Sequence, residues 1–83
     1  MSDRRIGVVR KWVEDRGFGF LKVLEKRDDG KPARVDRSFP DVFLHYYQIK
    51  NAGIAQVAVG DVLEFDVTQG DKGLNATKVS LVP

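Results

Sequence analysis

Cysteine is absent from this sequence, and histidine occurs only once, as His45. Without cysteine, neither a disulfide framework nor a thiolate zinc site can form, which is compatible with a reducing cytoplasm. A catalytic pair or a metal site built on histidine needs partners that the sequence does not supply. The segment GDKG (70–73) has neither the spacing of a Walker phosphate loop nor a Ser or Thr after it. We therefore expect no enzyme activity, no metal and no cofactor.

Long apolar runs are also absent. No stretch is long enough to span a bilayer, and the charged first residues, MSDRRIG (1–7), are not followed by the apolar segment of a secretory signal. The 83 residues suffice for one domain, 1–83, with a core that is small but adequate for independent folding. We expect a cytoplasmic monomer that makes no contact with membranes.

Charge of one sign is in little excess, because the formal net charge is only +2. Its distribution is uneven: residues 1–37 contain eleven Lys and Arg against seven Asp and Glu, whereas residues 38–83 contain three against five. A basic surplus indicates an anionic partner, although more often it is only a solvated face. The charge pattern alone therefore shows that the basic surplus lies in residues 1–37, but it does not identify a function.

What the sequence does contain is a series of short segments rich in β-branched and aromatic residues, separated by turn residues. Segment 48–60 is expected to be a connection with about one helical turn, and prolines confine any strand in 32–40 to a sheet edge. Five or six short strands predict an all-β fold, either a small antiparallel barrel or a sandwich. The main expected strands are 6–14, 17–26, 41–47, 61–67 and 74–82.

The second expected strand contains RGFGFL (16–21), in which two phenylalanines alternate with glycines. Residues two apart in a strand point to the same face. Phe18 and Phe20 therefore share one face, while the glycines and Leu21 face the core. The glycines are expected to let the backbone bend tightly into a small barrel.

The same alternation applies to DVFLHYY (41–47). It directs Val42 and Leu44 inward and Phe43 and His45 outward. If the two strands are neighbours, they present four rings on one surface. Tyr46 follows at the strand end, either Lys11 or Trp12 joins from the first strand, depending on its register, and further basic residues lie around them: Arg10, Arg16 and Lys22.

Phenylalanine is usually buried, so a core is the ordinary interpretation of these rings. The chain, however, has enough other apolar residues for the core of a protein this small, and an exposed aromatic patch needs a purpose. Unpaired bases stack on flat rings for roughly 1–3 kcal/mol each while cations meet the phosphates. Because a duplex hides its base faces, we expect a single-stranded ligand. The expected core is Val9, Leu21, Val23, Val42, Leu44, Ile49, Val62, Phe65, Val67, Val79 and Leu81.

With these motifs the chain resembles a cold-shock domain. RGFGFL (16–21) resembles the family's first ribonucleoprotein motif, usually Lys-Gly-Phe-Gly-Phe-Ile, and DVFLHY (41–46) resembles the second, usually Asp-Val-Phe-Val-His-Phe. VAVGDVLEF (57–65) resembles the opening of the fourth strand, and GDKGLNATKV (70–79) the Gly-rich turn and last strand. The resemblance covers nearly the whole chain. It implies a small five-stranded antiparallel OB-fold barrel, here with an extended loop or hairpin at about 22–40.

The resemblance also implies a function. It predicts binding of single-stranded RNA or DNA, with a role as an RNA chaperone or as a cold-shock or stress regulator of transcription or translation, and a preference for pyrimidine-rich strands is in keeping with the family. Bases would stack on the five rings of the two motifs, Arg16 and Lys72 match basic positions, and Asp41 matches a polar position that bonds base edges. The expected binding residues are Lys11, Trp12, Arg16, Phe18, Phe20, Asp41, Phe43, His45, Tyr46 and Lys72.

Two aromatic positions depart from the family pattern, which usually has Lys-Trp-Phe-Asn in the first strand. If residues 7–17 are matched to the family pattern without a gap, Lys11 stands at the Trp position and Trp12 at the Phe position. We favour this match. With a turn one residue shorter, Trp12 keeps the usual role. Either way one ring is missing, which weakens binding by about one stacking term. Ile54 stands where the long connection usually carries Phe or Tyr.

The third departure is the length of segment 22–40. In one interpretation, its basic residues extend the row of cations that contacts the phosphates of the bound strand. In another they are merely solvated charges on a protruding hairpin, because residues 25–37 hold five basic and four acidic side chains. In a third interpretation, the segment is a flap that binds another protein. These departures leave open a second class of function, a protein-interaction module on the same barrel with weak nucleic-acid binding.

Overall fold

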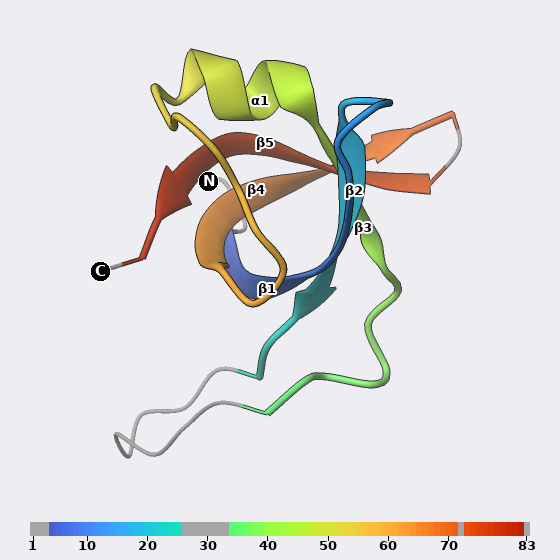
Figure 1. Cartoon of the computed structure of the whole chain (residues 1–83). Coiled ribbons are helices and arrows are strands. Elements are labelled where there is room, and N and C mark those ends of the chain that lie inside the picture. The colour runs from blue at the N-terminus through green and yellow to red at the C-terminus, as the bar shows by residue number, and fades with distance from the viewer. Residues whose placement is uncertain (1–3, 26–33, 72, 83) are drawn as a thin grey trace.

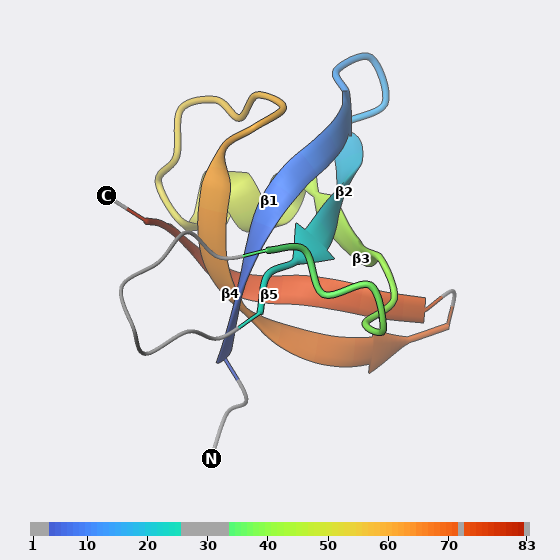
Figure 2. The same cartoon turned by 90° about the horizontal axis from the view of Figure 1, so that it is seen from below.

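The computed structural model describes residues 4–25, 34–71 and 73–82, which form a closed barrel with one short helix. Figure 1 shows α1 across one end of the barrel, and Figure 2 views the barrel from the other end. The strand order is β1-β2-β3-β5-β4, and neighbours are antiparallel except β3 and β5, which pair in parallel. The expected all-β OB-fold barrel is confirmed. Its elements are β1 (Arg4–Val13), β2 (Phe18–Val23), β3 (Val42–His45), α1 (Tyr46–Asn51), β4 (Val62–Gly70) and β5 (Gly73–Leu81).

Alternate strand residues fill the barrel. Leu21 of β2 and Val42 and Leu44 of β3 are fully buried, which confirms the faces predicted from their alternation. In β4 the expectation is wrong by one position, because Leu63 is fully buried whereas Val62 is only half-buried. The buried apolar residues are Val9, Leu21, Val23, Val42, Leu44, Ile49, Val57, Leu63, Phe65, Ala76 and Val79.

The last strand departs from simple alternation. Val79 is buried, as expected, and Ala76 is buried as well, although the two are three residues apart. Leu81, expected in the core, is 55% exposed. Lys78 has a positive φ of 49°, and the β4–β5 ladder shifts register at this level. A bulge adds one residue to a strand and reverses the faces of the residues beyond it. The bulge therefore accounts for the three-residue spacing of Ala76 and Val79, whereas Leu81, two residues beyond Val79, is exposed at the last position of β5.

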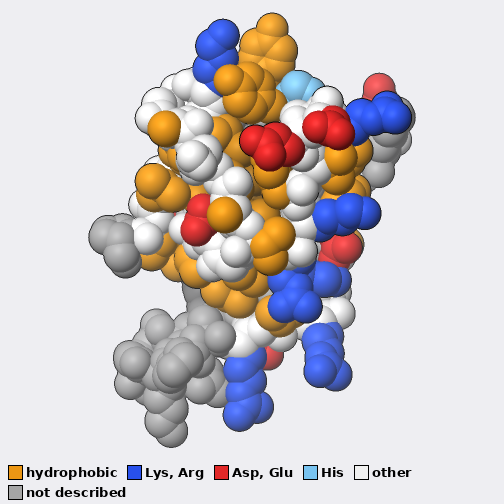
Figure 3. All heavy atoms as spheres, in the orientation of Figure 1, with side chains coloured by type: hydrophobic (Ala, Val, Ile, Leu, Met, Phe, Trp, Pro, Cys, Tyr) orange, Lys and Arg blue, Asp and Glu red, His pale blue; other side chains and the backbone are white. Residues whose placement is uncertain are grey.

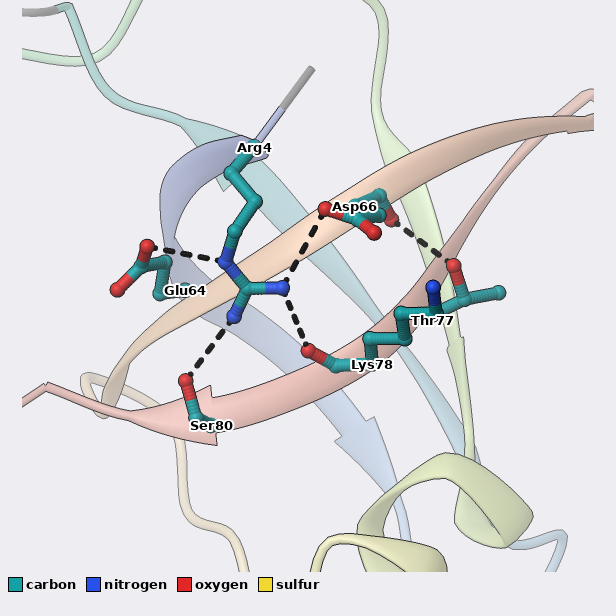
Figure 4. A network of polar contacts seen from close by, with 6 residues as sticks. All are labelled: Arg4, Glu64, Asp66, Thr77, Lys78 and Ser80. Carbon is teal, nitrogen blue, oxygen red and sulfur yellow. Dashed lines mark hydrogen bonds and ion pairs between the residues drawn. The ribbon is translucent and has the colours of Figure 1, made fainter. Parts of the chain in front are cut away.

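Arg4, at the start of β1, joins three strands at this bulge (Figure 4). Its Nε lies 3.0 Å from Oε1 of Glu64, and its Nη1 lies 3.3 Å from Oδ1 of Asp66. The same Nη1 donates to the carbonyl of Lys78 at 3.0 Å, and Nη2 donates to Oγ of Ser80 at 3.1 Å. One guanidinium thus links β1 to β4 and β5, with all three of its nitrogens engaged.

Helix α1 begins directly after β3. His45 is the N-cap: its backbone is extended, and its Nδ1 accepts a hydrogen bond from the N–H of Tyr47 at 3.1 Å. Ile49 is buried and anchors the helix to the barrel, and Gly53, with φ 74°, follows its end. The expected strand 41–47 therefore stops two residues early, because the side chain of His45 satisfies a backbone donor that a strand would leave open.

The long connection between β2 and β3 begins as a hairpin. Leu24 pairs with Val35 in an antiparallel bridge, and the N–H of Glu25 donates to the carbonyl of Arg34 at 2.8 Å. These pairs continue β2 beyond the barrel, away from α1 (Figure 1). The expected extended hairpin is confirmed at its base, whereas its tip, residues 26–33, lies outside the described residues.

The return of this hairpin carries a tight polar turn. Oδ1 of Asp36 accepts hydrogen bonds from Oγ of Ser38 at 2.6 Å and from its backbone N–H at 3.0 Å. These two bonds, helped by the positive charge of Arg5, hold the pKa of Asp36 below its ordinary value. The turn orders the chain before it enters β3.

Candidate nucleic-acid interface

Two glycines of RGFGFL shape the surface next to them. Gly17 closes the β1–β2 turn with φ 69°, a conformation that L side chains rarely adopt. At Gly19 a Cβ atom would lie 2.1 Å from the carbonyl oxygen of Lys11, so only glycine lets β1 approach β2 this closely. The glycines thus act through one turn and one close strand contact, which is more specific than the general bending we expected.

The outward rings of β2 and β3 form one continuous surface, which we call the aromatic platform: Phe18, Phe20, Phe43 and His45. Phe18 is paired with His45, and Phe20 with Phe43, in the β2–β3 ladder. The ring centroids of Phe18 and Phe43 are 5.4 Å apart with planes at 28°, those of Phe20 and Phe43 are 5.7 Å apart, and those of Phe43 and His45 are 6.2 Å apart. The three phenylalanines are half-buried and His45 is exposed, so their faces are accessible. The structure therefore brings together the four rings expected from the alternation.

On the β1 side the platform is bordered by Lys11. Lys11 lies opposite Phe20, whereas Trp12 lies opposite Gly19 and so faces the other side of the sheet. A register shift between Val9 and Lys11 sets this arrangement. Of the two registers left open by the sequence, the structure has the one in which Lys11 takes the platform position. Trp12 instead packs against the core.

Tyr46 also lies off the platform. Its N–H donates to the carbonyl of Gly17 at 2.7 Å, and its half-exposed side chain lines a hollow of about 350 Å³ together with Trp12. Trp12 and Tyr46 thus share a second site beside the β1–β2 turn. That Trp12 and Tyr46 contact nucleic acid remains a prediction, and the contact would be made in this hollow and not on the platform.

Tyr47 is the aromatic residue that sequence reasoning missed. Its ring stacks on His45, with centroids 5.7 Å apart and planes at 18°, and its side chain is 64% exposed. Sequence reasoning followed the alternation of 41–47 only as far as His45, with Tyr46 at the strand end, and assigned Tyr47 to no surface. Only the helix start at Tyr46 brings the two rings together.

Charged residues flank the platform on both sides. Lys22, next to Phe20 along β2, forms an ion pair with Asp41, which is exposed just before β3. Arg16 is exposed in the β1–β2 turn beside Glu14. Figure 3 shows Lys and Arg side chains along the flank where β2 and β3 lie in Figure 1. The expected basic residue Lys72 lies outside the described residues.

A shallow hollow of about 440 Å³ opens where the platform meets the β4–β5 turn. Phe20 and Phe43 form its apolar wall, and Asp41 and Asn75 add polar groups. Asn75 pairs with Phe43 in the parallel β3–β5 ladder, which puts an amide next to a stacking ring. An amide offers both a donor and an acceptor, the groups that base edges bond. Sequence reasoning missed Asn75 because its partner strand is far away in the chain.

Other kinds of site find less support. Among the residues that the structure describes, no three His, Asp or Glu side chains gather as a metal site would require. Within the same ranges, no helix has the length and apolar character needed to cross a membrane.

Comparison with known proteins decides the family. The model of the 'Cold-shock' DNA-binding domain matches residues 33–82. The chain is 38% identical over 79 residues to the cold shock-like protein CspA of Shewanella violacea, covering 95% of this chain and 96% of that protein. It is 34% identical over 83 residues to the major cold shock protein CspA of Pseudomonas aeruginosa, covering 99% of this chain and all of that protein. The chain belongs to the cold-shock domain family.

As a cold-shock domain, the chain is a nucleic-acid-binding protein of the cold-shock response and not an enzyme. A further relative, cold shock protein ScoF of Streptomyces coelicolor, is 34% identical over 74 residues, which cover 89% of this chain and 92% of that protein. The matches to the two relatives named above span nearly the whole chain, including both strands of the platform. The family assignment thus agrees with the resemblance inferred from the two aromatic motifs.

Proposed function

We propose that this cold-shock domain binds single-stranded RNA or DNA on the aromatic platform and acts as an RNA chaperone. The observation that carries the proposal is the accessible ring series of Phe18, Phe20, Phe43 and His45, bordered by Lys11 and Lys22. Bases stack on the ring faces, and the cations meet the phosphates. Base stacking tolerates many sequences because every base has a flat face.

The chaperone mechanism needs no catalysis. An unpaired segment of RNA binds while it is transiently open, and each stacked base contributes roughly 1–3 kcal/mol. A weak hairpin has only a small free energy of folding, so two or three stacked bases shift its equilibrium toward the open state. In this way the protein keeps RNA unfolded at low temperature, and this opening is how it would influence transcription or translation.

Fluorescence titration of a labelled oligo-dT tests the binding. The wild type should bind, binding should weaken as salt rises, and Phe18→Ala and Phe43→Ala should each weaken it by about fivefold or more. A duplex of the same length should bind far more weakly, because its base faces are hidden. Absence of binding to any single strand at low salt would refute the proposal and favour a protein-interaction module.

A hairpin RNA with a fluorophore and a quencher at its ends tests the chaperone activity. Adding the wild type should raise fluorescence as the hairpin opens, and Phe43→Ala should require more protein for the same effect. If the protein binds single strands but leaves the hairpin closed at every concentration, the chaperone role is wrong and the binding proposal stands.

A further inference from the structure

The ring series of the platform does not stop at the end of β3. Phe43 and His45 are 6.2 Å apart, and Tyr47, on α1, stacks on His45 at 5.7 Å with nearly parallel planes. Tyr47 is 64% exposed, more than any platform ring that is half-buried in the sheet. A large exposed aromatic side chain that extends a series of four other rings forms a patch that calls for a ligand.

The position of Tyr47 is fixed by its backbone. Its N–H donates to Nδ1 of His45 at 3.1 Å, so the residue and the ring it stacks on are held together. The same turn of α1 is anchored to the barrel by Ile49, which is buried. A tyrosine has only two side-chain torsions to order, so a preorganised ring binds a flat ligand at small entropic cost.

A cation lies on the same side of the helix. Lys50 is exposed and follows Tyr47 by three residues, a spacing that makes two side chains neighbours on a helix surface. An aromatic ring with a lysine next to it has the chemistry of one nucleotide site, with a face for the base and a charge for the phosphate.

The other route for a bound strand lacks a ring at residue 54. Ile54, at the position where the long connection of the family usually carries Phe or Tyr, is half-buried and packs against the core. A base that leaves His45 toward residues 55–58 meets Trp12 and Tyr46 in their separate hollow but no ring at Ile54. A base that continues over α1 meets Tyr47, whose ring already stacks on His45.

We propose that Tyr47 and Lys50 form an additional nucleotide subsite, which extends the platform from β3 onto α1. The base bound there is the neighbour of the base on His45, and its phosphate meets Lys50. This inference rests on the proposed binding of single strands, and it adds one nucleotide to the length of strand that the protein holds.

The test measures the affinity of oligo-dT from about four to about nine nucleotides for the wild type and for Tyr47→Ala. For strands too short to reach α1 the two proteins should bind equally. For longer strands Tyr47→Ala should bind about five- to 150-fold more weakly, the loss of one stacked base. Replacing each base in turn by an abasic site should weaken the wild type at one position where it leaves Tyr47→Ala unchanged.

Four further variants separate stacking from folding, from general apolarity and from the contribution of charge. Tyr47→Phe should retain the wild-type affinity, and Tyr47→Leu should behave like Tyr47→Ala, since leucine offers no flat face. Leu81→Ala, at a similarly exposed apolar residue of β5, should bind as the wild type does at every length. Lys50→Gln should reduce the salt dependence of long strands by about one phosphate contact. Circular dichroism of each variant checks the fold.

Two results would overturn the subsite. In the first, Tyr47→Ala binds like the wild type at all lengths while Phe18→Ala loses affinity, which leaves the platform function intact. In the second, Tyr47→Ala weakens all lengths equally and couples to no abasic position, which would make Tyr47 only a support for His45. Absence of wild-type binding would instead contradict the proposed function itself.

Discussion

Phe43 is the central ring of the platform. It lies within ring-contact distance of Phe18, Phe20 and His45, and it also lines the hollow beside Asn75. A ring held by its neighbours keeps its face in one orientation, which lowers the entropic cost of binding a base. Removing it takes away one stacking surface and loosens the others.

Phe43→Ala should therefore lower the affinity for oligo-dT more than Phe18→Ala does, by about 2–3 kcal/mol against about 1–2 kcal/mol. Titrations at one salt concentration measure both losses. Phe39→Ala is the matched control, because Phe39 is also half-buried but lies under the guanidinium of Arg5, at 4.9 Å, rather than on the platform. An equal loss in the control would mean that the platform is not the binding surface.

Gly19 is the residue on which the closeness of β1 and β2 depends. Gly19→Ala places a methyl group 2.1 Å from the backbone oxygen of Lys11, so the strands must separate. We expect unfolding in urea to show a loss of about 3 kcal/mol or more. Gly53→Ala, where φ is 74° and no atom lies near the new methyl group, should cost only about 1 kcal/mol. Similar losses in both variants would contradict the close-approach argument.

At the scale of the strands and the helix, the sequence predicted β2 and β3 well because their alternation is unbroken. It was less accurate in β5, where the bulge at Lys78 interrupts the alternation between Ala76 and Val79 and where Leu81, expected in the core, is exposed at the end of the strand. It also missed Tyr47, because the helix start depends on a hydrogen bond from its own backbone to His45. The platform was predictable, whereas its continuation onto α1 was not.

Arg4 bonds to the bulge in β5 through the carbonyl of Lys78 and acts as a clamp between β1, β4 and β5. Arg4→Ala removes the ion pairs to Glu64 and Asp66 and leaves the carboxylate of Asp66, a residue only 7% exposed, without that partner. We expect the free energy of unfolding in urea to fall by about 1–2 kcal/mol. Arg10→Ala, at an exposed position of the same strand, should change it by less than about 0.5 kcal/mol. A loss at Arg10 as large as at Arg4 would argue against the clamp.

The turn before β3 should respond to acid. The pKa of Asp36 is below 3.8 in the folded protein, so its ionised form stabilises the turn above the ordinary pKa, and this contribution is lost as the pH falls through the lowered value. Titration of the Asp36 carboxyl by NMR should give a midpoint below 3.8. Ser38→Ala should raise the midpoint toward the ordinary value, whereas Ser80→Ala, whose hydroxyl bonds Arg4, should leave it unchanged. A midpoint that Ser38→Ala does not move would contradict this cause.

At the scale of the whole molecule, the small net charge of +2 limits the electrostatic part of binding. The cations next to the platform are Lys11, Arg16 and Lys22. For strands too short to reach Lys50, three phosphate contacts give a slope of about −2 for the logarithm of affinity against the logarithm of salt, or about fourfold weaker binding for each doubling of salt. Titrations over a salt series measure the slope. A slope near about −5 would show that the basic residues of the 22–40 segment also contact the strand.

The contacts of Arg4 also limit how far the chain can fold during its synthesis on the ribosome, because they need residues near the C-terminus. Arg4 belongs to the first strand, and its partners lie 60 to 76 residues later. At about 5–20 residues per second, a ribosome takes roughly 4–15 s to deliver Ser80 after Arg4. During that time β1 and β2 can pair locally, but the barrel stays open on the side of β4. The base-stacking motifs are synthesised first, yet they gain their rigid support only when the last strand arrives.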